Sequence, residues 1–512
     1  MTTSTLSADD SSLPDSTRQF DDLWGHPKPL WMLFMAEFWE RFAFYGIRWA
    51  LTLYIVAQFF NGDASGQSFA SNTYGAYLAL VYASAIFGGY IADKVIGAQH
   101  SILIGAVVMG IGLFIIMLPN QTFFMVGLST VIVGNGLFKP NISNLVGKLY
   151  APDDKRRDNG FSIFYMGINA GAMVSPIITQ WLASTLTDTP MMDNYKAVFG
   201  AAGVGMIISY VWFYLGRKQL KGIGAIKKSP IRTKNLAYVI VGTLLSIAPV
   251  YLLMAFAGAQ ILAWILFVLF IALGVMLLTH AKSISKVAFE RVIACLIMFS
   301  FNVIFFMFFE QAGSSFTFLA QNIVDRQITE AFEFKIAWFQ SVNSVSILIF
   351  APIVTALWVF LAKYKFEPNI PQKFALGLLG TGLGFLVLVY ALENLLDTNN
   401  MIPIWPLAAC YVLHTIGELC LSPIGLSMVS KLIPASLAGF AFGGWFLSTA
   451  IGNNFSGIVA GSMSGESGMT VISALSGFSF SFWLLTGGAV ALFILIPGIN
   501  KLMHVVKYRL LP

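Results

Sequence analysis

The segment that decides the fold reads Glu37-Phe38-Trp39-Glu40-Arg41-Phe42-Ala43-Phe44-Tyr45-Gly46-Ile47-Arg48, and it lies inside an apolar stretch from Leu30 to about Phe60. Its four charged residues, with Phe44 and Tyr45, fall on one side of a helix at about 100° per residue. Charged side chains in a membrane span are costly, so they usually face a water-filled cavity or pair with one another. The segment therefore indicates either a functional cavity or a buried structural cluster of ion pairs.

Composition places the whole chain in a membrane. Of its 512 residues, 57% are hydrophobic and 11% are charged, whereas soluble proteins have about 25% charged residues. The three cysteines (Cys295, Cys410 and Cys420) lie in apolar stretches, and neither they nor the five histidines have metal-ligand spacing. The sequence has no HExxH or GxSxG motif. We therefore expect no enzyme, no metal site and no cofactor.

Fourteen apolar stretches are long enough to cross a bilayer, since a hydrocarbon core of about 30 Å needs roughly 20 helical residues. They cover about 30–60, 71–96, 101–118, 122–149, 159–185, 197–216, 235–256, 260–280, 288–320, 334–362, 373–394, 402–432, 437–462 and 473–499. Residues 1–28 are polar and acidic, without the basic start and apolar core of a signal peptide. We expect this segment to be a disordered cytoplasmic tail.

The basic residues orient these spans. With the N-terminus in the cytoplasm, 24 of the 30 Lys and Arg residues fall on the cytoplasmic side, three fall on the opposite side and three lie within spans. This asymmetry follows the positive-inside rule, and it predicts that both termini are cytoplasmic. The net charge of +6 is then a consequence of topology, and nucleic acid is not an expected partner.

The longest basic loop, Arg217 to Lys234, separates six spans from the rest of the chain. Two spans without internal charge follow it, and six more begin at about residue 288. The predicted organisation is a tail (1–28), a six-helix bundle (29–217), a basic linker with two inserted helices (218–286), and a second six-helix bundle with a short cytoplasmic tail (287–512). Paired bundles with charges near mid-membrane are typical of transporters that work by alternating access.

Seven charged residues lie well inside spans: Glu37, Glu40, Glu310 and Glu418, and Arg41, Arg48 and Lys139. The first half of the chain holds two acids and all three bases, and the second half holds only two acids. A cavity between the halves would have one positive and one negative wall. Such a field suits a zwitterionic substrate, with a carboxylate and an ammonium at opposite ends.

The depth of these charges in the membrane predicts which of them pair across the two halves of the chain. Arg48 lies about 16 Å beyond Glu37 along the first span, and Glu310 lies in the outer half of the ninth span. We predict that Arg48 and Glu310 pair as an outer gate when the outer entrance is shut. Lys139 and Glu418 lie nearer mid-depth and form a second predicted contact. Static pairs that only fix helix register are the alternative.

Uncharged polar groups in other spans are further candidates. Asn169 and Asn343 carry amides that can donate to a carboxylate or accept from an ammonium, although bridging two helices is an equally common role. The remaining candidates for a cavity wall are Tyr45, Tyr82, Ser422 and Trp445. Each of them alone is more often a packing residue than a ligand.

A glycine-rich run, Gly377-Leu-Leu-Gly-Thr-Gly-Leu-Gly384, has a superficial likeness to a dinucleotide-binding loop. It lies inside an apolar span, where small residues four apart allow helices to pack closely. We therefore interpret it as a packing motif.

The motif Glu37-x-x-Glu40-Arg41-Phe42-x-Phe44-Tyr45-Gly46 resembles the first-helix E-x-x-E-R-F-x-Y-Y-G motif of proton-dependent oligopeptide transporters, a family of the major facilitator superfamily. Further matches to family signatures are the glycine-aspartate stretch at 88–97, Phe138-Lys139-Pro140-Asn141, Phe161 to Gly171, Glu310-Gln311 and Glu418-Leu-Cys-Leu-Ser422-Pro423. The resemblance implies an all-α major facilitator fold, with two six-helix bundles and two extra helices between them. It also implies import of di- and tripeptides with protons across a bacterial cytoplasmic membrane.

The resemblance also implies roles for individual residues. Arg41 and Lys139 would bind the peptide carboxylate, and Asn169, Asn343 and Glu418 would hold its amino end. Glu37 and Glu40 would take part in proton coupling together with Glu310, which would also form the outer gate with Arg48. Tyr45, Tyr82 and Trp445 would shape the pocket for side chains.

Two positions depart from the family. The first tyrosine of the motif is Phe44 here, which removes a hydroxyl from the pocket, and Gly75 stands where mammalian members carry a histidine. Proton sensing would then rest on carboxylates. The alternative function is transport of another small solute, such as a sugar, nitrate or a drug. A sugar carrier would not need opposed charged walls, and an anion carrier would make little use of Glu418.

Overall fold

The structure is a computed structural model that describes residues 20–151, 154–187, 193–225, 231–434 and 436–504. The chain divides into two compact units. The first contains the residues up to Ile47 and Ser84–Ala255, and the second contains Arg48–Ala83 and Phe256–Pro512. Helices α1 and α2 therefore contribute to both units. The division into tail, bundles and linker that the basic loop suggested stays a prediction.

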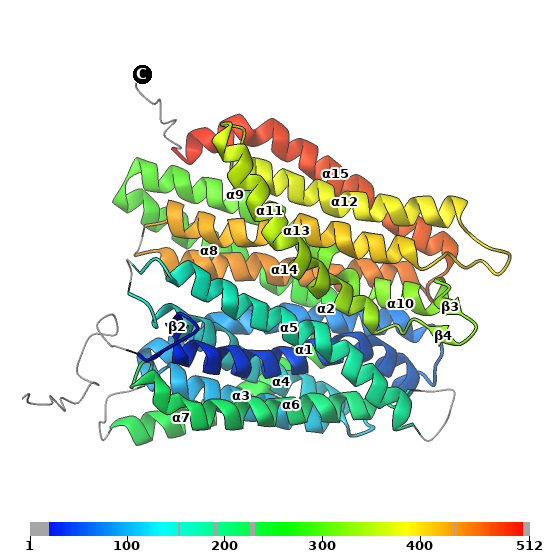
Figure 1. Cartoon of the computed structure of the whole chain (residues 1–512), viewed down its shortest axis with the longest axis horizontal. Coiled ribbons are helices and arrows are strands. Elements are labelled where there is room, and N and C mark those ends of the chain that lie inside the picture. Colours follow the sequence, from blue (N-terminus) through cyan, green and yellow to red (C-terminus); the bar gives the residue numbers. More distant parts are fainter. Residues whose placement is uncertain (1–19, 152–153, 188–192, 226–230, 435, 505–512) are drawn as a thin grey trace, which may run out of the picture. The chain divides into compact units, whose positions relative to one another are not determined.

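The first unit is built from helices and one short hairpin. Its elements are β1 (Asp22–Leu23), β2 (His26–Pro27), the start of α1 (Lys28–Phe59), the end of α2 (Gly66–Ile91), the π-turn η3 (Ala92–Ile96), α3 (Ala98–Ile116), α4 (Gln121–Gly147), α5 (Arg157–Thr185), α6 (Tyr195–Gly216), the 3-10 turn η4 (Arg217–Leu220) and α7 (Ile231–Leu252). Helices α3 and α4 pack along each other and lie side by side in Figure 1.

The second unit holds the rest of α1 and α2 and the later helices. Its other elements are α8 (Gly258–Ile284), α9 (Lys286–Phe309), the 3-10 turn η6 (Glu310–Gly313), α10 (Ser315–Asn322), β3 (Gln327–Thr329), β4 (Phe332–Glu333), α11 (Trp338–Lys363), α12 (Ile370–Asn394), α13 (Trp405–Leu432), α14 (Ala438–Ser464) and α15 (Val471–Leu502). Within this unit α12 packs against both α13 and α15, and α14 packs against α9 (Figure 1).

Each of the fourteen predicted spans coincides with a helix of 19 residues or more within the described residues. By length and hydropathy, twelve helical segments of the described residues qualify as membrane spans, because α7 and α8 count as one and α14 is not among them. The ninth span, predicted as one helix over 288–320, is wrong in one respect. Helix α9 ends at Phe309, the 3-10 turn η6 follows, and α10 begins at Ser315. The sequence Gly313-Ser314-Ser315 contributes to the break, because Ser314 has non-helical backbone angles (φ −128°, ψ −94°). Glu310 therefore lies at the end of a helix.

Helices α7 and α8 follow each other with only the π-turn Leu253–Ala257 (η5) between them. Gly258 is the first residue of α8, and its φ of +65° interrupts the right-handed helical backbone between α7 and α8. The glycine therefore separates a helix of 22 residues from one of 27 residues. Each is long enough to cross a bilayer.

Several helices begin where the sequence provides a capping side chain. Asn120 accepts from the backbone N–H of Thr122 (2.8 Å) at the start of α4, and Ser285 accepts from that of Ala288 (3.0 Å) at the start of α9. Such side chains satisfy N–H groups that have no partner inside the helix. These caps therefore stabilise the starts of α4 and α9.

Small residues set the closest helix contacts, as the glycine-rich run in α12 predicted. A Cβ atom on Gly377 would lie 2.9 Å from the carbonyl oxygen of Gly417 in α13, and a Cβ on Gly417 would lie 2.6 Å from that of Gly377. The packing interpretation of this run is therefore confirmed. Gly105 and Gly134 bring α3 and α4 together in the same way, with corresponding distances of 2.7 and 2.8 Å.

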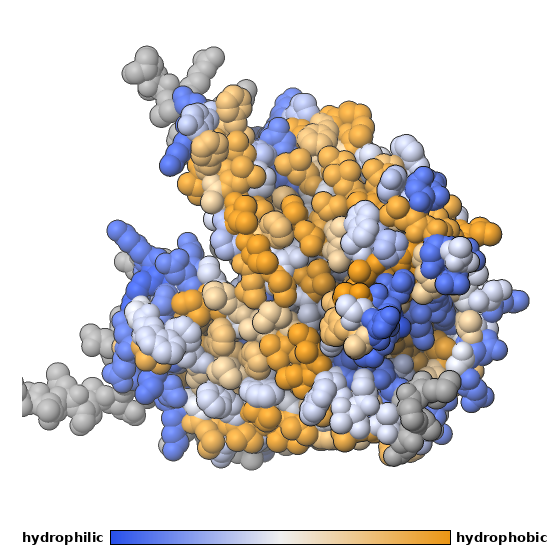
Figure 2. All heavy atoms as spheres, turned by 45° about the vertical axis from the view of Figure 1, so that its right-hand side comes forward, coloured by the Kyte–Doolittle hydropathy of each residue, from blue (hydrophilic) through white to orange (hydrophobic). Residues whose placement is uncertain are grey.

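The surface is apolar over much of its area. Figure 2 shows hydrophobic residues across the visible face and hydrophilic residues gathered toward its margins. Large exposed side chains include Leu245 of α7, Trp264 of α8, Phe360 of α11 and Trp483 of α15. Such a surface is stable in contact with lipid rather than water. The chain is therefore a multi-pass membrane protein, in agreement with its composition.

The hairpin β1–β2 lies within the segment that was expected to be a disordered tail, so that expectation is wrong for Asp22–Pro27; residues 1–19 lie outside the described residues. Arg156 fastens the hairpin, because its Nη1 donates to Oδ2 of Asp22 (2.8 Å) and to the carbonyl oxygen of Gly25 (3.3 Å). His26 is hydrogen-bonded to the hydroxyl of Tyr150 (2.9 Å). Side-chain and backbone hydrogen bonds from Arg156 hold the pKa of Asp154 below its ordinary value of 3.8.

Replacing Arg156 by Ala should release the hairpin. We expect faster hydrogen–deuterium exchange at residues 23–26 in the Arg156→Ala protein than in the wild type, with Arg157→Ala as the control. A carboxylate whose pKa is lowered in the folded protein stabilises the fold fully when the pH is above the ordinary pKa. This stabilisation is lost only as the pH falls through the lowered pKa. The difference in protection between the wild type and Asp154→Asn should therefore be the same at pH 5 and pH 7. Equal exchange in wild type and Arg156→Ala would show that the arginine does not hold the hairpin.

Candidate functional site

Two carboxylates share one guanidinium on the first-unit part of α1. Arg41 lies one residue after Glu40 and one turn after Glu37, so all three face the same side of the helix. The Nη2 of Arg41 donates to Oε1 of Glu40 (2.7 Å), its Nε donates to Oε2 of the same residue, and its Nε lies 3.1 Å from Oε1 of Glu37. All three side chains are buried, with at most 4% of their surface exposed. Both carboxylates therefore engage the Nε–Nη2 edge of the Arg41 guanidinium.

Helix α4 completes this cluster with a residue that sequence reasoning missed. Asn135 is fully buried, and its Nδ2 donates to Oε1 of Glu40 (3.1 Å). It lies one turn before Lys139 on the same face of α4, and the charge of Lys139 acts on Glu37. An amide one turn before an intramembrane lysine was the signal that could have identified it.

Two oxygen atoms of this cluster lack hydrogen-bond partners among the described residues. They are Oε2 of Glu37 and Oδ1 of Asn135. A buried acceptor without a donor costs about 1–3 kcal/mol. Such atoms are places where a proton, a water molecule or a donor on a ligand lowers the free energy. The cluster is therefore chemically suited to exchange protons and to accept a charged ligand.

The other first-unit candidates lie near this part of α1. Phe44 places its ring centroid 5.1 Å from the Arg41 guanidinium carbon, and Tyr45 packs edge-on against Phe44. Asn169 is buried on α5 and donates to the carbonyl oxygen of Tyr165 in its own helix (2.9 Å). Helix α5 approaches α1 closely, because a Cβ on Gly171 would lie 2.5 Å from the carbonyl oxygen of Phe38.

Arg48 and Glu310 form a buried ion pair within the second unit. The Nη2 of Arg48 lies 2.6 Å from Oε2 of Glu310, and both residues are less than 10% exposed. The Nε of Arg48 donates to the hydroxyl of Tyr74 on α2 (2.7 Å). Thr52, one turn further along α1, donates to the carbonyl oxygen of Gly313 (3.1 Å). The pairing predicted from depth is confirmed, and its role as a gate stays a prediction.

A carboxylate and an amide meet on α11 and α13 of the same unit. The Nδ2 of Asn343 donates to Oε2 of Glu418 (3.2 Å) and to the hydroxyl of Thr415 (2.9 Å). The charges of Glu310 and Arg48 both act on Glu418. Ser422 follows Glu418 by one turn, and its buried Oγ has no hydrogen-bond partner within the described part of the chain. The carboxylate of Glu418 and the hydroxyl of Ser422 therefore lie one turn apart on the same face of α13.

Trp445 lies in the packed interior of the second unit. It is 4% exposed and contacts Phe299 and Phe374, with ring centroids 6.0 and 6.2 Å away. Gly425 makes room for it, since a Cβ there would lie 1.9 Å from the indole ring. Tyr82 is half-buried on α2. The predicted part of both residues in a substrate pocket stays a prediction.

The candidate residues form two groups. The first comprises Glu37, Glu40 and Arg41 with the missed Asn135, and the second comprises Arg48 and Glu310 with the nearby Asn343 and Glu418. The predicted contact of Lys139 with Glu418 would join the two units, and it stays a prediction. No group of His, Cys, Asp and Glu residues that could hold a metal ion occurs among the described residues.

Comparison with known proteins identifies the family. The family model described as PTR2, POT family, matches residues 99–473. The chain belongs to the POT family. Peptide transporter YePEPT of Yersinia enterocolitica subsp. palearctica is 32% identical over 502 residues, which cover 94% of this chain and 96% of the relative. Dipeptide and tripeptide permease B of Salmonella typhimurium is 32% identical over 437 residues, which cover 85% and 86% of the two chains.

Solved structures of POT proteins have the same fold. The peptide transporter POT in complex with sulfate has a TM-score of 0.80 and 31% identity, covering 96% of this chain and 98% of that one. A POT family transporter in complex with 5-aminolevulinic acid has a TM-score of 0.79 and 29% identity, covering 96% of this chain and 100% of that one. The fold is therefore the major facilitator fold predicted from the sequence, and the protein is a transporter and not an enzyme.

The hydrogen bond from Asn135 to Glu40 gives a test of the first group. We expect Asn135→Ala to lower the free energy of unfolding by about 1–3 kcal/mol, since the acceptor is a buried carboxylate. The loss should be smaller in a Glu40→Gln background. Thermal unfolding of the purified proteins in detergent measures both losses.

Asn141 provides the matched control for this cycle. It is also a buried α4 amide, but it donates to the carbonyl oxygens of Gly88 (3.2 Å) and Leu137 (2.7 Å). Asn141→Ala should lower the free energy of unfolding by the same amount whether residue 40 is Glu or Gln. An Asn135→Ala loss that is equally insensitive to the residue at position 40 would contradict the assigned hydrogen bond.

Proposed function

We propose that this POT family member is a symporter that imports di- and tripeptides together with protons by alternating access. The observation that carries the proposal is the guanidinium of Arg41, held by two buried carboxylates, in one unit, together with the Asn343–Glu418 pair in the other. A peptide has a carboxylate and an ammonium, which match the guanidinium of Arg41 and the carboxylate of Glu418 in charge. The names of the relatives, peptide transporter and dipeptide and tripeptide permease, support this substrate class.

The cluster on α1 suggests how protons and peptide are coupled. Glu37 and Glu40 both engage the Nε–Nη2 edge of Arg41, so a peptide carboxylate can bind that edge only when these partners withdraw. Protonation of either glutamate removes the negative charge that competes for the guanidinium. Arg41 and Lys139 then bind the peptide carboxylate, and Asn169, Asn343 and Glu418 hold its amino end. Tyr45, Tyr82, Ser422 and Trp445 line the side-chain pocket.

Arg48 and Glu310 form the outer gate in this proposal. Protonation of Glu310 removes the charge that holds Arg48, and the buried arginine then favours a position where water can reach it. Helices α2 and α14 are packed against each other while this ion pair is formed. A Cβ on Gly75 would lie 2.6 Å from the Cα of Gly457, so the glycine at the position of the mammalian histidine permits this contact.

The α2–α14 contact has features of a surface that separates during transport. Ser71, Asn453 and Ser456 bury polar side-chain atoms that have no hydrogen-bond partner among the described residues. They lie near the close contact, because a Cβ on Gly457 would lie 2.6 Å from the carbonyl oxygen of Ser71. A polar atom without a partner is less unfavourable when water can reach it and form the missing hydrogen bond. Opening this contact would therefore offset part of the cost of separating the helices.

The proposed location is a bacterial cytoplasmic membrane with both termini in the cytoplasm. The asymmetry of Lys and Arg between the two sides supports this orientation. With the N-terminus inside, Arg48 and Glu310 face the external half of the membrane. Protons entering from outside therefore reach the gate before they reach the cluster at Arg41.

Uptake into proteoliposomes tests the function. We expect an inside-alkaline pH gradient to drive accumulation of labelled di-alanine, and unlabelled di-alanine to compete while free alanine and nitrate do not. Glu418→Gln should weaken peptide affinity by about ten- to hundredfold, since it removes a charge-assisted contact. Glu393→Gln, at an exposed position near the end of α12, is the control. Di-alanine uptake that is the same with and without the pH gradient would exclude symport. Competition by nitrate or a sugar would indicate that the protein transports another solute.

A further inference from the structure

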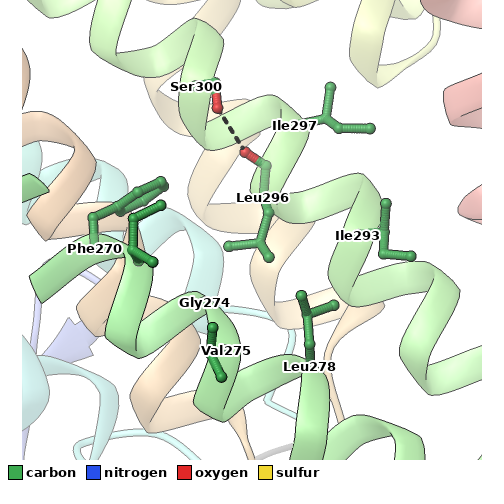
Figure 3. A pocket seen from close by; sticks show the side chains of 9 residues that line it. Phe270, Gly274, Val275, Leu278, Ile293, Leu296, Ile297 and Ser300 are labelled. Atoms are coloured by element: carbon green, nitrogen blue, oxygen red, sulfur yellow. Dashed lines mark hydrogen bonds between the residues drawn. The ribbon is translucent and has the colours of Figure 1, made fainter. Parts of the chain in front are cut away.

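An apolar groove runs along the surface between α8 and α9, both of which belong to the second unit. It has a volume of about 340 Å³ and is lined by Phe270, Gly274 and Leu278 of α8 and by Ile293, Leu296 and Ile297 of α9, with further residues shown in Figure 3. Gly274 forms its floor, because a Cβ there would lie 3.7 Å from the methyl groups of Leu296. None of the transport residues assigned above lines this groove.

The lining of the groove is almost entirely apolar. Its one hydroxyl, on Ser300, donates to the carbonyl oxygen of Leu296 in the same helix (3.2 Å), as the dashed line in Figure 3 shows. Side chains at its rim are open to the surroundings, with Ile271 50% exposed and Val275 55% exposed. In a multi-pass membrane protein these surroundings are lipid tails. The chemistry of the groove therefore selects a hydrocarbon chain.

The length of the groove matches one leaflet of a bilayer. Phe270 and Leu278 are eight residues apart, which is about 12 Å along a helix. Half of a hydrocarbon core of about 30 Å is about 15 Å. An acyl chain that lies along the groove would therefore place its headgroup just beyond Leu278, near the end where α8 and α9 meet.

Two exposed lysines stand at that end. Lys282 lies one turn beyond Leu278 on the same face of α8, and Lys286 lies two turns before Ile293 on the same face of α9. Only Ser285 lies between Ile284, the last residue of α8, and Lys286. Arg291 follows one turn later, and its buried Nε has no hydrogen-bond partner among the described residues.

The carboxylate of Glu290, near this end of the groove, already has basic partners. Glu290 is in contact with His504 and lies 3.9 Å from Lys286, whose side chain is 87% exposed. Lys282 also has an exposed side chain. The end of the groove is therefore positively charged, and it complements a phosphate group.

We propose that the α8–α9 groove is a binding site for one anionic phospholipid. One acyl chain fills the groove over Gly274, and the phosphate lies between Lys282 and Lys286. The lipid would fasten the inserted helix α8 to α9 along a line where protein side chains leave space.

Native mass spectrometry of the full chain in mild detergent tests this site. We expect phosphatidylglycerol to bind more tightly than phosphatidylcholine with the same acyl chains, and inorganic phosphate not to displace it. Gly274→Leu should reduce phosphatidylglycerol binding by filling the groove. Lys282→Ala with Lys286→Ala should weaken it by about 25-fold, because each lysine near an anionic headgroup contributes about fivefold.

Two control variants separate a specific site from general effects. Gly242→Leu changes an α7 glycine that has open space around it, and Lys363→Ala with Lys365→Ala removes two exposed lysines at the end of α11. Neither control should alter binding. Equal binding of the two lipids, displacement by phosphate, or equal losses in the control variants would overturn the proposal. The lysine variant changes only exposed side chains, so it tests the site even if Gly274→Leu fails to fold.

Discussion

A charge inside a bilayer persists only where an opposite charge, a hydrogen-bonding group or water compensates for its lost hydration. In this chain Glu37 and Glu40 hold Arg41, and Glu310 and Tyr74 hold Arg48. Neither arginine can lose its partners unless another anion replaces them or water reaches the guanidinium. In the proposed mechanism, this constraint allows a proton or a substrate carboxylate to change the packing around α1. The function proposed for the protein depends on it.

Helix α1 connects the two arginines physically. It is one helix of 32 residues, and Arg41 and Arg48 are seven residues, or about 10 Å, apart along it. The first belongs to one compact unit and the second to the other. In the proposed mechanism, a change in the contacts of either arginine acts on the helix that carries both. Glu310 lies where α9 gives way to a 3-10 turn, a kind of interruption at which helices often bend.

Much of this arrangement could be predicted from the sequence, because charges in apolar spans are few and their depth follows from helix geometry. The pairing of Arg48 with Glu310 and the packing role of Gly377 were predicted in this way. Other features depend on contacts between distant segments. The partner of Glu40 on α4, Asn135, carries no charge to draw attention to it. The break after Phe309 lies in an apolar run that is equally compatible with a continuous helix, and the burial of Trp445 depends on the missing side chain of Gly425.

The central claim is that Glu310 holds the outer side closed through Arg48. Spin labels at Asp63→Cys and Glu330→Cys, two exposed positions of the second unit, allow the distance across this side to be measured by double electron–electron resonance. The three native cysteines are buried, which limits their reaction with the label. The account predicts one dominant distance in the otherwise wild-type protein and a shift to longer distances in Glu310→Gln, with no shift in Glu393→Gln. An unchanged distribution in Glu310→Gln would contradict it.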